Sequence, residues 1–322
     1  MYKIYDDWPN LAKKAYDSIL DSVHFEKIDH IVFAGMGGSG AIGDLFVSLL
    51  SETNLYVTLV KGYLLPKTIG KNTLVVITSV SGNTIETLTV LESAQKLNCK
   101  IIVFCGGGKI KQFCIDNKVN FRIIDAIHSP RASFVTYVYS ILKTLQNILS
   151  IDENHISSSI DSLYDMQKQI SSNNLSDTNP ALDLATWISG IPLIYYPWGL
   201  NAVAIRFKNS LQENSKLHSM IEDIIETCHN GIVSWDNPSL VQPILIQGKN
   251  DHEKTIQRWK IVKELFKEKG IDYREIFSID GNLLSKLMSL IYLFDYTSIY
   301  HSVLFKIDPS PVNSIDFIKK RL

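Results

Sequence analysis

Three hydroxyl side chains, Ser79, Ser81 and Thr84, surround Gly82 in one short segment. The apolar run 73–78 (TLVVIT) before them predicts a buried strand, and a helical segment follows them. A strand, a turn and a helix in this order aim backbone N–H groups and the positive end of a helix dipole at one point. The segment therefore predicts a phosphate site, although Ser and Thr before a helix are also typical of an ordinary N-cap.

A glycine-rich turn, residues 35–40 (GMGGSG), connects a predicted strand at 30–34 to a predicted helix at 41–50. Its glycines match the GxGxxG pattern of dinucleotide-binding loops. Such a loop is normally followed by an acidic residue that binds the ribose at the end of the next strand. Here the next strand, 56–60, ends in Lys61, with no carboxylate. This spacing argues against a nicotinamide cofactor.

The composition excludes several classes of protein. Of the 322 residues, 45% are hydrophobic, and a formal net charge of −1 gives no electrostatic case for nucleic acid or an acidic membrane. The four Cys form no CxxC pair, and the eight His show no metal-ligand spacing. No apolar run approaches the length of a membrane span, and the N-terminus does not resemble a signal peptide. We expect a soluble, cytoplasmic protein without a metal or cofactor.

Strands and helices alternate twice along the chain. In the first half, strands are predicted at 30–34, 56–60, 73–78, 100–105 and 121–124. In the second half, they are predicted at 191–196, 242–247 and 274–279, with helices at 201–217, 251–269 and 283–304. Alternation of this kind is typical of parallel sheets covered by helices on both faces. Polar residues at 151–180 separate the halves, so we expect a first domain of residues 1–152 and a second of residues 153–322.

Five motifs together resemble a known enzyme family. Gly37-Gly38-Ser39 and the segment 79–87 (SVSGNTIET) resemble the sugar isomerase (SIS) domain. Residues 129–131 (SPR), 212–216 (QENSK) and 228–230 (CHN) resemble the branch of bifunctional phosphoglucose/phosphomannose isomerases. The resemblance covers nearly the whole chain. It implies two SIS domains, each a flavodoxin-like αβα sandwich with a parallel sheet. It also implies a homodimer and metal-independent interconversion of glucose 6-phosphate and fructose 6-phosphate, with mannose 6-phosphate as a further substrate.

The same resemblance implies a role for particular residues. The sugar-phosphate site falls on Gly38, Ser39, Ser79, Ser81 and Thr84. Glu213 falls on the catalytic base, Arg131 on the arginine beside the reacting carbons, and His229 on the ring-opening histidine of the neighbouring subunit. The active-site lysine falls on Lys319, with Lys320 as the alternative. One departure is Gly231, because the family usually has an acidic residue after His-Asn.

The residue types suit this chemistry. A carboxylate can take a proton from one carbon and return it to the next, and Leu211 and Leu217 near Glu213 favour its partial burial. A fixed guanidinium such as Arg131 would stabilise an enediolate, and an imidazole such as that of His229 suits the proton transfer that opens a cyclic sugar. Taken singly, each is a residue type that is common on protein surfaces.

Two alternatives stay open at this stage. An isomerase of another sugar phosphate would share the phosphate site without needing Arg131, Glu213 and His229. A non-enzymatic sugar-phosphate regulator normally carries a DNA-binding helix-turn-helix and basic charge. Neither of these is evident in the sequence.

Overall fold

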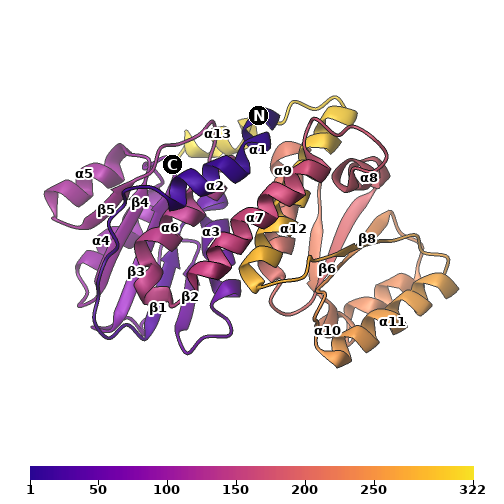
Figure 1. Ribbon diagram of the computed structural model, residues 1–322, viewed down its shortest axis with the longest axis horizontal. Helices are drawn as coiled ribbons and strands as arrows, with labels where there is room; N and C mark the ends of the chain where they lie inside the picture. Colours follow the sequence, from indigo (N-terminus) through magenta and orange to yellow (C-terminus); the bar gives the residue numbers. More distant parts are fainter. The chain divides into compact units, whose positions relative to one another are not determined.

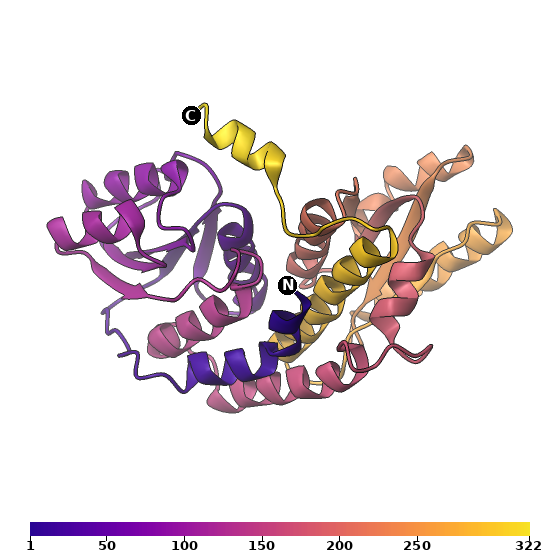
Figure 2. The same ribbon diagram turned by 90° about the horizontal axis from the view of Figure 1, so that it is seen from above.

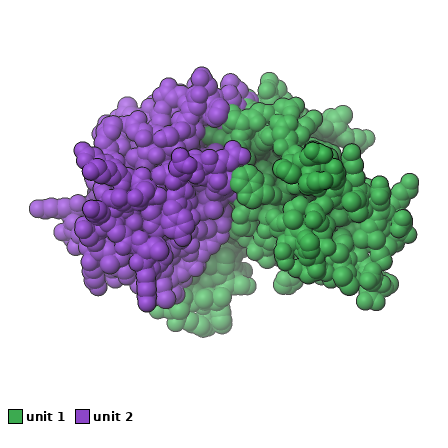
Figure 3. Space-filling model, turned by 90° about the horizontal axis from the view of Figure 1, so that it is seen from below, with its two compact units in different colours: residues 1–6, 162–322 green, residues 7–161 purple.

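The computed structural model describes residues 1–322 and divides into two compact units (Figure 3). The N-terminal unit is Asp7–Asp161, and the C-terminal unit combines Met1–Asp6 with Ser162–Leu322. Helix α7 (Glu153–Ile170) begins at the domain boundary expected between residues 152 and 153. The N-terminal unit ends inside this helix, at Asp161, and the C-terminal unit resumes at Ser162. No helix is long and apolar enough to cross a membrane.

The N-terminal unit contains a five-stranded, wholly parallel sheet in the order β2-β1-β3-β4-β5 (Figure 1). This is the strand order of flavodoxin-like folds. Its strands are β1 (His30–Ala34), β2 (Tyr56–Val60), β3 (Thr73–Ser79), β4 (Lys100–Cys105) and β5 (Asn120–Ile123). Every residue of β1 and β3 is buried, which explains why these strands appear in the sequence as continuous apolar runs.

Helices cover both faces of this sheet. They are α2 (Trp8–Tyr16), α3 (Gly37–Leu49), α4 (Ile85–Gln95), α5 (Gly108–Asp116) and α6 (Phe134–Leu149). On one face, strand residues such as Val75 and Val103 form a core with α4 and α5. On the other, Phe33 of β1 stacks on Phe46 of α3 with ring centroids 4.9 Å apart. The alternation of side chains along each strand thus supplies two separate cores.

The C-terminal unit repeats the plan with four parallel strands in the order β7-β6-β8-β9. The strands are β6 (Ile191–Tyr196), β7 (Met220–Asp223), β8 (Val241–Gln247) and β9 (Arg274–Phe277). One face packs on α10 (Ile224–Thr227), the 3₁₀ helix η1 (Gly231–Asp236) and α11 (Glu253–Glu268). The helices α8 (Pro180–Trp187), α9 (Asn201–Asn214) and α12 (Leu283–Leu304) pack together; Phe207 of α9 stacks on Phe294 of α12.

Both ends of the chain belong to the C-terminal unit. Helix α1 (Tyr2–Asp6) lies beside α12, and the Tyr292 hydroxyl donates to the Tyr5 carbonyl at 2.5 Å (Figure 2). The last helix, α13 (Asn313–Lys319), has no buried residue.

The predicted fold class is confirmed: both units are α/β with parallel sheets flanked by helices. Several elements differ from the prediction. The helix expected to begin at 41 begins at Gly37. The spacing of apolar residues over 8–23 predicts one helix, but α2 ends at Tyr16 and Ile19 is fully exposed. Helices α5 and α7 and strand β7 were not expected.

Candidate active site

The reversal of strand order in the N-terminal unit makes the carboxyl ends of β1 and β3 a topological switch point. From β1 the chain passes outward to β2, then returns across β1 to β3 on its other side. The loops after two such neighbouring strands diverge, and open α/β sheets bind ligands at this switch point. Residues 35–39 follow β1 and residues 80–84 follow β3. Both predicted phosphate-binding segments therefore lie at this edge of the sheet.

Hydrogen bonds join the predicted hydroxyl groups into one cluster. The backbone N–H of Val80 donates to Ser39 Oγ at 3.2 Å, which ties the two loops together. Thr84 Oγ1 lies 3.2 Å from Ser79 Oγ and 3.4 Å from Ser81 Oγ. Ser79 is buried and Ser81 is exposed, so the cluster extends from the sheet to the surface.

The helices that begin at this cluster have no side-chain cap. The N-cap residues are Met36 for α3 and Thr84 for α4, and the side chain of neither accepts a hydrogen bond from its helix. The Thr84 hydroxyl contacts Ser79 and Ser81 instead. The first turn of a helix carries unpaired N–H groups and partial positive charge, so each helix start here suits an anion.

Gly82 shapes the turn between Ser81 and α4. Its φ of +65° is in the left-handed region, and an added Cβ would lie 1.9 Å from the Gly107 carbonyl oxygen. The Asn83 side chain accepts a hydrogen bond from the Lys109 N–H at 3.0 Å, which joins the turn to the start of α5. No other residue type fits at position 82 without moving the backbone.

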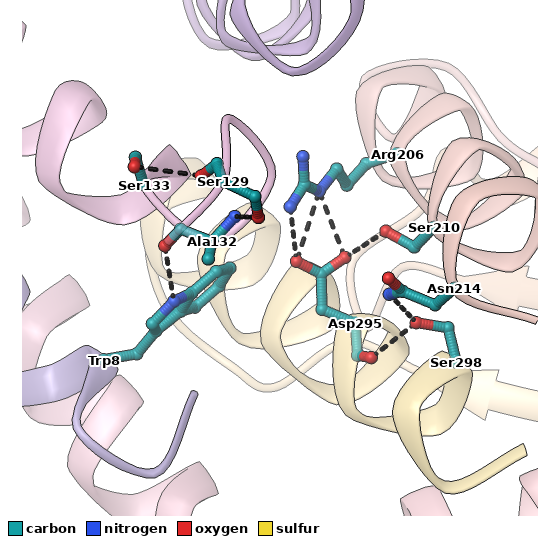
Figure 4. Close-up of polar contacts among 9 residues, drawn as sticks. All are labelled: Trp8, Ser129, Ala132, Ser133, Arg206, Ser210, Asn214, Asp295 and Ser298. Carbon is teal, nitrogen blue, oxygen red and sulfur yellow. Dashed lines mark hydrogen bonds and ion pairs between the residues drawn. The ribbon is translucent and has the colours of Figure 1, made fainter. Parts of the chain in front are cut away.

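Arg131 lies next to the start of α3. A Cβ added at Gly38 would be 3.0 Å from the carbonyl carbon of Pro130 and 3.2 Å from the Arg131 nitrogen, so these backbones are in close contact. Arg131 is 4% exposed. The turn that carries it is fixed by Trp8 Nε1, which donates to the Ala132 carbonyl at 3.3 Å (Figure 4). The structure thus brings Arg131 to the same helix start as Ser39.

Glu213 lies in the last turn of α9, in the C-terminal unit, and is half-buried. The two residues after it are anchored to Ser298 of α12. Asn214 Nδ2 donates to Ser298 Oγ at 2.8 Å, and Ser215 Oγ donates to the Ser298 carbonyl at 2.9 Å. These bonds fix the backbone from which the Glu213 carboxylate projects.

A buried ion pair anchors α9 to α12 two turns before Glu213. Arg206 is 2% and Asp295 of α12 is 0% exposed, and Arg206 Nη2 lies 2.6 Å from Asp295 Oδ2 (Figure 4). Ser210 Oγ donates to the same carboxylate at 2.5 Å. Burial by itself would lower the pKa of Arg206, but the carboxylates of Asp295 and Glu213 raise it above its ordinary value.

The sequence analysis missed this pair, although a signal was present. Asp295 is the only acidic residue in the apolar helix α12, and a single acid among Leu, Phe and Tyr indicates a buried partner. With Asn214 and Ser298, the pair forms a line of polar contacts between α9 and α12, which we call the α9–α12 ladder (Arg206, Ser210, Asn214, Asp295 and Ser298).

The remaining predicted residues are on the surface of the C-terminal unit. His229 follows α10 and is exposed, and Lys319 and Lys320 are exposed at the end of α13. Asp308 lies in the segment that leads to α13, and the Ser310 N–H lowers the pKa of its carboxyl group. The charge of Lys216, just after the end of α9, lowers the same pKa more weakly. Lys216 in turn donates to the Glu213 carbonyl at 2.6 Å.

The predicted site residues therefore fall into two sets. Gly38, Ser39, Ser79, Ser81, Thr84 and Arg131 lie in the N-terminal unit, and Glu213, His229 and Lys319 lie in the C-terminal unit. The first set is in mutual contact through the loops after β1 and β3 and the 129–133 turn.

The fold and this arrangement define a class of sugar isomerase domains. Residues 24–149 match the SIS domain family, and residues 177–322 match the family described as the bacterial phospho-glucose isomerase C-terminal SIS domain. A putative tagatose-6-phosphate ketose/aldose isomerase from Clostridium novyi shares the fold, with a TM-score of 0.72 and 14% identity over 96% of this chain and 89% of that chain.

Two relatives identify the branch within this class. The chain is 32% identical to a bifunctional phosphoglucose/phosphomannose isomerase from Caldicellulosiruptor bescii, over 100% of this chain and 98% of the relative. It is 29% identical to the protein of the same name from Aquifex aeolicus, over 91% of this chain and 90% of that relative. The chain belongs to the family of bifunctional phosphoglucose/phosphomannose isomerases and is an isomerase enzyme.

Proposed function

We propose that this protein is a homodimeric, cytoplasmic enzyme that interconverts glucose 6-phosphate and fructose 6-phosphate and also accepts mannose 6-phosphate. The observation that carries the proposal is the hydroxyl cluster at the switch point of the N-terminal unit, at the uncapped starts of α3 and α4. A dianionic phosphate matches such a site in charge and in hydrogen-bond acceptors. The identity to the two relatives over at least 91% of the chain supports the same substrates.

In the proposed mechanism the phosphate anchors the sugar. Its oxygens accept hydrogen bonds from the hydroxyls of Ser39, Ser79, Ser81 and Thr84, and from N–H groups at the start of α3 near Gly38. Binding at this end fixes the distance from the phosphate to carbons 1 and 2, so that the reacting carbons face the catalytic groups.

Glu213 is the proposed base. Its carboxylate takes the proton from C2 of open-chain glucose 6-phosphate, and the electrons of the C–H bond form a C1–C2 double bond with negative charge on O1. The proton on O2 moves to O1, and Glu213 returns its proton to C1, which gives fructose 6-phosphate. No metal takes part in this scheme. The buried Arg131 guanidinium stabilises the negative oxygen of the cis-enediolate.

His229 is proposed to open the sugar ring, with Lys319 as its partner. The histidine moves a proton from the C1 hydroxyl to the ring oxygen, a step suited to an imidazole because its two nitrogens can accept and donate protons. In the proposed dimer His229 reaches the site of the neighbouring subunit. Its exposed position within one chain is consistent with that role.

The first test is turnover of fructose 6-phosphate, with glucose 6-phosphate and mannose 6-phosphate measured separately, with and without a chelator. We expect both products in the presence of chelator. Glucose 6-phosphate alone would narrow the specificity and keep the mechanism. No turnover of any hexose phosphate would favour an isomerase of another sugar phosphate, and binding without turnover would favour a non-enzymatic regulator.

Removal of the Ser81 and Thr84 hydroxyls should weaken substrate binding. Ser81→Ala with Thr84→Ala deletes two hydrogen-bond donors to a charged group, each worth about 1.5–3 kcal/mol, so KM should rise by at least about tenfold with a smaller change in kcat. The matched control is Thr89→Ala, which removes a hydroxyl from the same helix that donates to the Ile85 carbonyl at 3.0 Å. An unchanged KM in the double variant would place the phosphate elsewhere.

A further inference from the structure

The carboxylate of Glu222 occupies the space beside Gly231, two residues after His229. Glu222 is a half-buried residue of β7. A Cβ added at Gly231 would lie 2.6 Å from Glu222 Oε2 and 3.3 Å from its carboxyl carbon. Gly231 does not have a positive φ, so backbone strain does not require glycine here. The side-chain volume of position 231 is instead taken by a carboxylate from another element.

A buried hydroxyl holds this carboxylate in place. Thr227, the last residue of α10, is 1% exposed and donates to Glu222 Oε2 at 2.9 Å. The next residue of β7, Asp223, accepts hydrogen bonds from the N–H groups of Ile225 at 2.8 Å and Glu226 at 3.1 Å. Two consecutive carboxylates of β7 therefore tie both ends of the short helix α10 to the sheet.

The position of His229 depends on this helix. Its N–H donates to the Glu226 carbonyl at 2.9 Å, and the Asn230 N–H donates to the Thr227 carbonyl at 3.1 Å. Asn230 Nδ2 also donates to Glu226 Oε1 at 2.7 Å. The imidazole is exposed, so the backbone from Glu226 to Asn230 sets where the ring can reach.

We propose that Glu222 is a positioning residue for His229. It acts through Thr227 and through the space at Gly231, and it makes no contact with the sugar. The proposal rests on the proposed function, because that function gives His229 its role in opening the ring. Position 231 carries glycine in this chain because any side chain there would displace the Glu222 carboxylate from Thr227.

The kinetic test compares Glu222→Ala with Glu222→Gln. A displaced general acid–base group costs on the order of tenfold to a hundredfold in rate, so Glu222→Ala should lower kcat for glucose 6-phosphate by that factor with little change in KM. Glu222→Gln keeps an oxygen that accepts from Thr227 and should retain most of the activity. Wild-type kinetics in Glu222→Ala would overturn the proposal.

Two combinations separate positioning from a general loss of structure. In a His229→Ala background, Glu222→Ala should cost nothing further, because the group it positions is gone; a full additional loss would contradict the proposal. Gly231→Glu should lower activity in the wild type, since it displaces Glu222, and should restore activity in Glu222→Ala by returning a carboxylate to the vacated space. Failure of this rescue together with an additive loss would assign Glu222 a purely structural role.

Amide hydrogen exchange gives a readout that does not depend on turnover. The N–H groups of residues 229 and 230, which are bonded to α10, should exchange faster in Glu222→Ala and at the wild-type rate in Glu222→Gln. Unchanged exchange in both variants would overturn the proposal. If the wild-type enzyme turns over no hexose phosphate, the proposed function fails, while this measurement still decides whether Glu222 orders the segment.

Discussion

The Glu213→Gln variant should lose isomerase activity while it still binds fructose 6-phosphate. Glutamine preserves the shape of the side chain but cannot accept a proton from carbon, and loss of a general base costs typically about 10²- to 10⁴-fold in rate. The flanking contacts of Asn214 and Ser215 with Ser298 stay intact, so the end of α9 should keep its structure. The expected result is a large fall in kcat with a nearly unchanged dissociation constant.

Solvent exchange makes this test specific for proton abstraction. In D₂O the wild-type enzyme should exchange the hydrogen on C2 of glucose 6-phosphate, as followed by proton NMR, and Glu213→Gln should not. The matched control is Gln212→Asn, a conservative change of the exposed neighbour on the same turn. Turnover within a few-fold of wild type in Glu213→Gln would remove Glu213 as the base.

The second large effect is expected on stability, from Asp295→Ala. This change leaves the Arg206 guanidinium buried without the carboxylate that contacts it at 2.6 Å. Removal of one partner of a buried ion pair typically costs about 3–5 kcal/mol, because the remaining charge has lost its water and its partner. Urea unfolding, followed by tryptophan fluorescence, should show a correspondingly lower free energy of unfolding.

A paired replacement distinguishes lost charge compensation from lost packing. In Arg206→Met with Asp295→Leu, both charges are absent and the volume is largely kept, which is often neutral or stabilising. The double variant should therefore be more stable than Asp295→Ala. A cost below about 1 kcal/mol for Asp295→Ala would show that the ion pair does not anchor α9.

The sequence predicts most of the sheet because its strands are short, buried and rich in β-branched residues. The strands at 30–34, 56–60, 100–105 and 191–196 agree with the structure at both ends. Strand β7 was missed, because it has four residues, none of them buried. An edge strand of this kind gains its structure from pairing with β6, which leaves no local pattern.

Helix α7 was missed for a different reason. Its polar composition led to no helix prediction for residues 153–170, yet Ile156, Ile160, Leu163 and Ile170 are all buried at helical spacing. A narrow apolar stripe can fix a helix whose average composition is polar. Periodicity would have been the better criterion here than composition.

The sequence predicts which residues form the candidate site better than it predicts the contacts between them. The contacts among Ser79, Ser81 and Thr84 form within six residues of chain, so local spacing is sufficient to predict them. The contact of Gly38 with Arg131 and the α9–α12 ladder join residues far apart in the sequence. These contacts depend on how strands are ordered and how helices pack, which local patterns do not specify.

The assignment of the first six residues to the C-terminal unit has a consequence for synthesis on the ribosome. Asp6 accepts hydrogen bonds from the Ser172 N–H at 3.0 Å and from the hydroxyl of Tyr296, so a segment made before the N-terminal unit is bound by residues made after it. Residues 7–161 can complete their sheet as they emerge, since domains generally fold as units during translation. The other unit must wait for α12, and until then its N-terminal segment lacks the contacts of Tyr5 with Tyr292 and of Asp6 with Tyr296. Nascent chains stalled before residue 296 should therefore carry one protease-resistant unit and one sensitive unit.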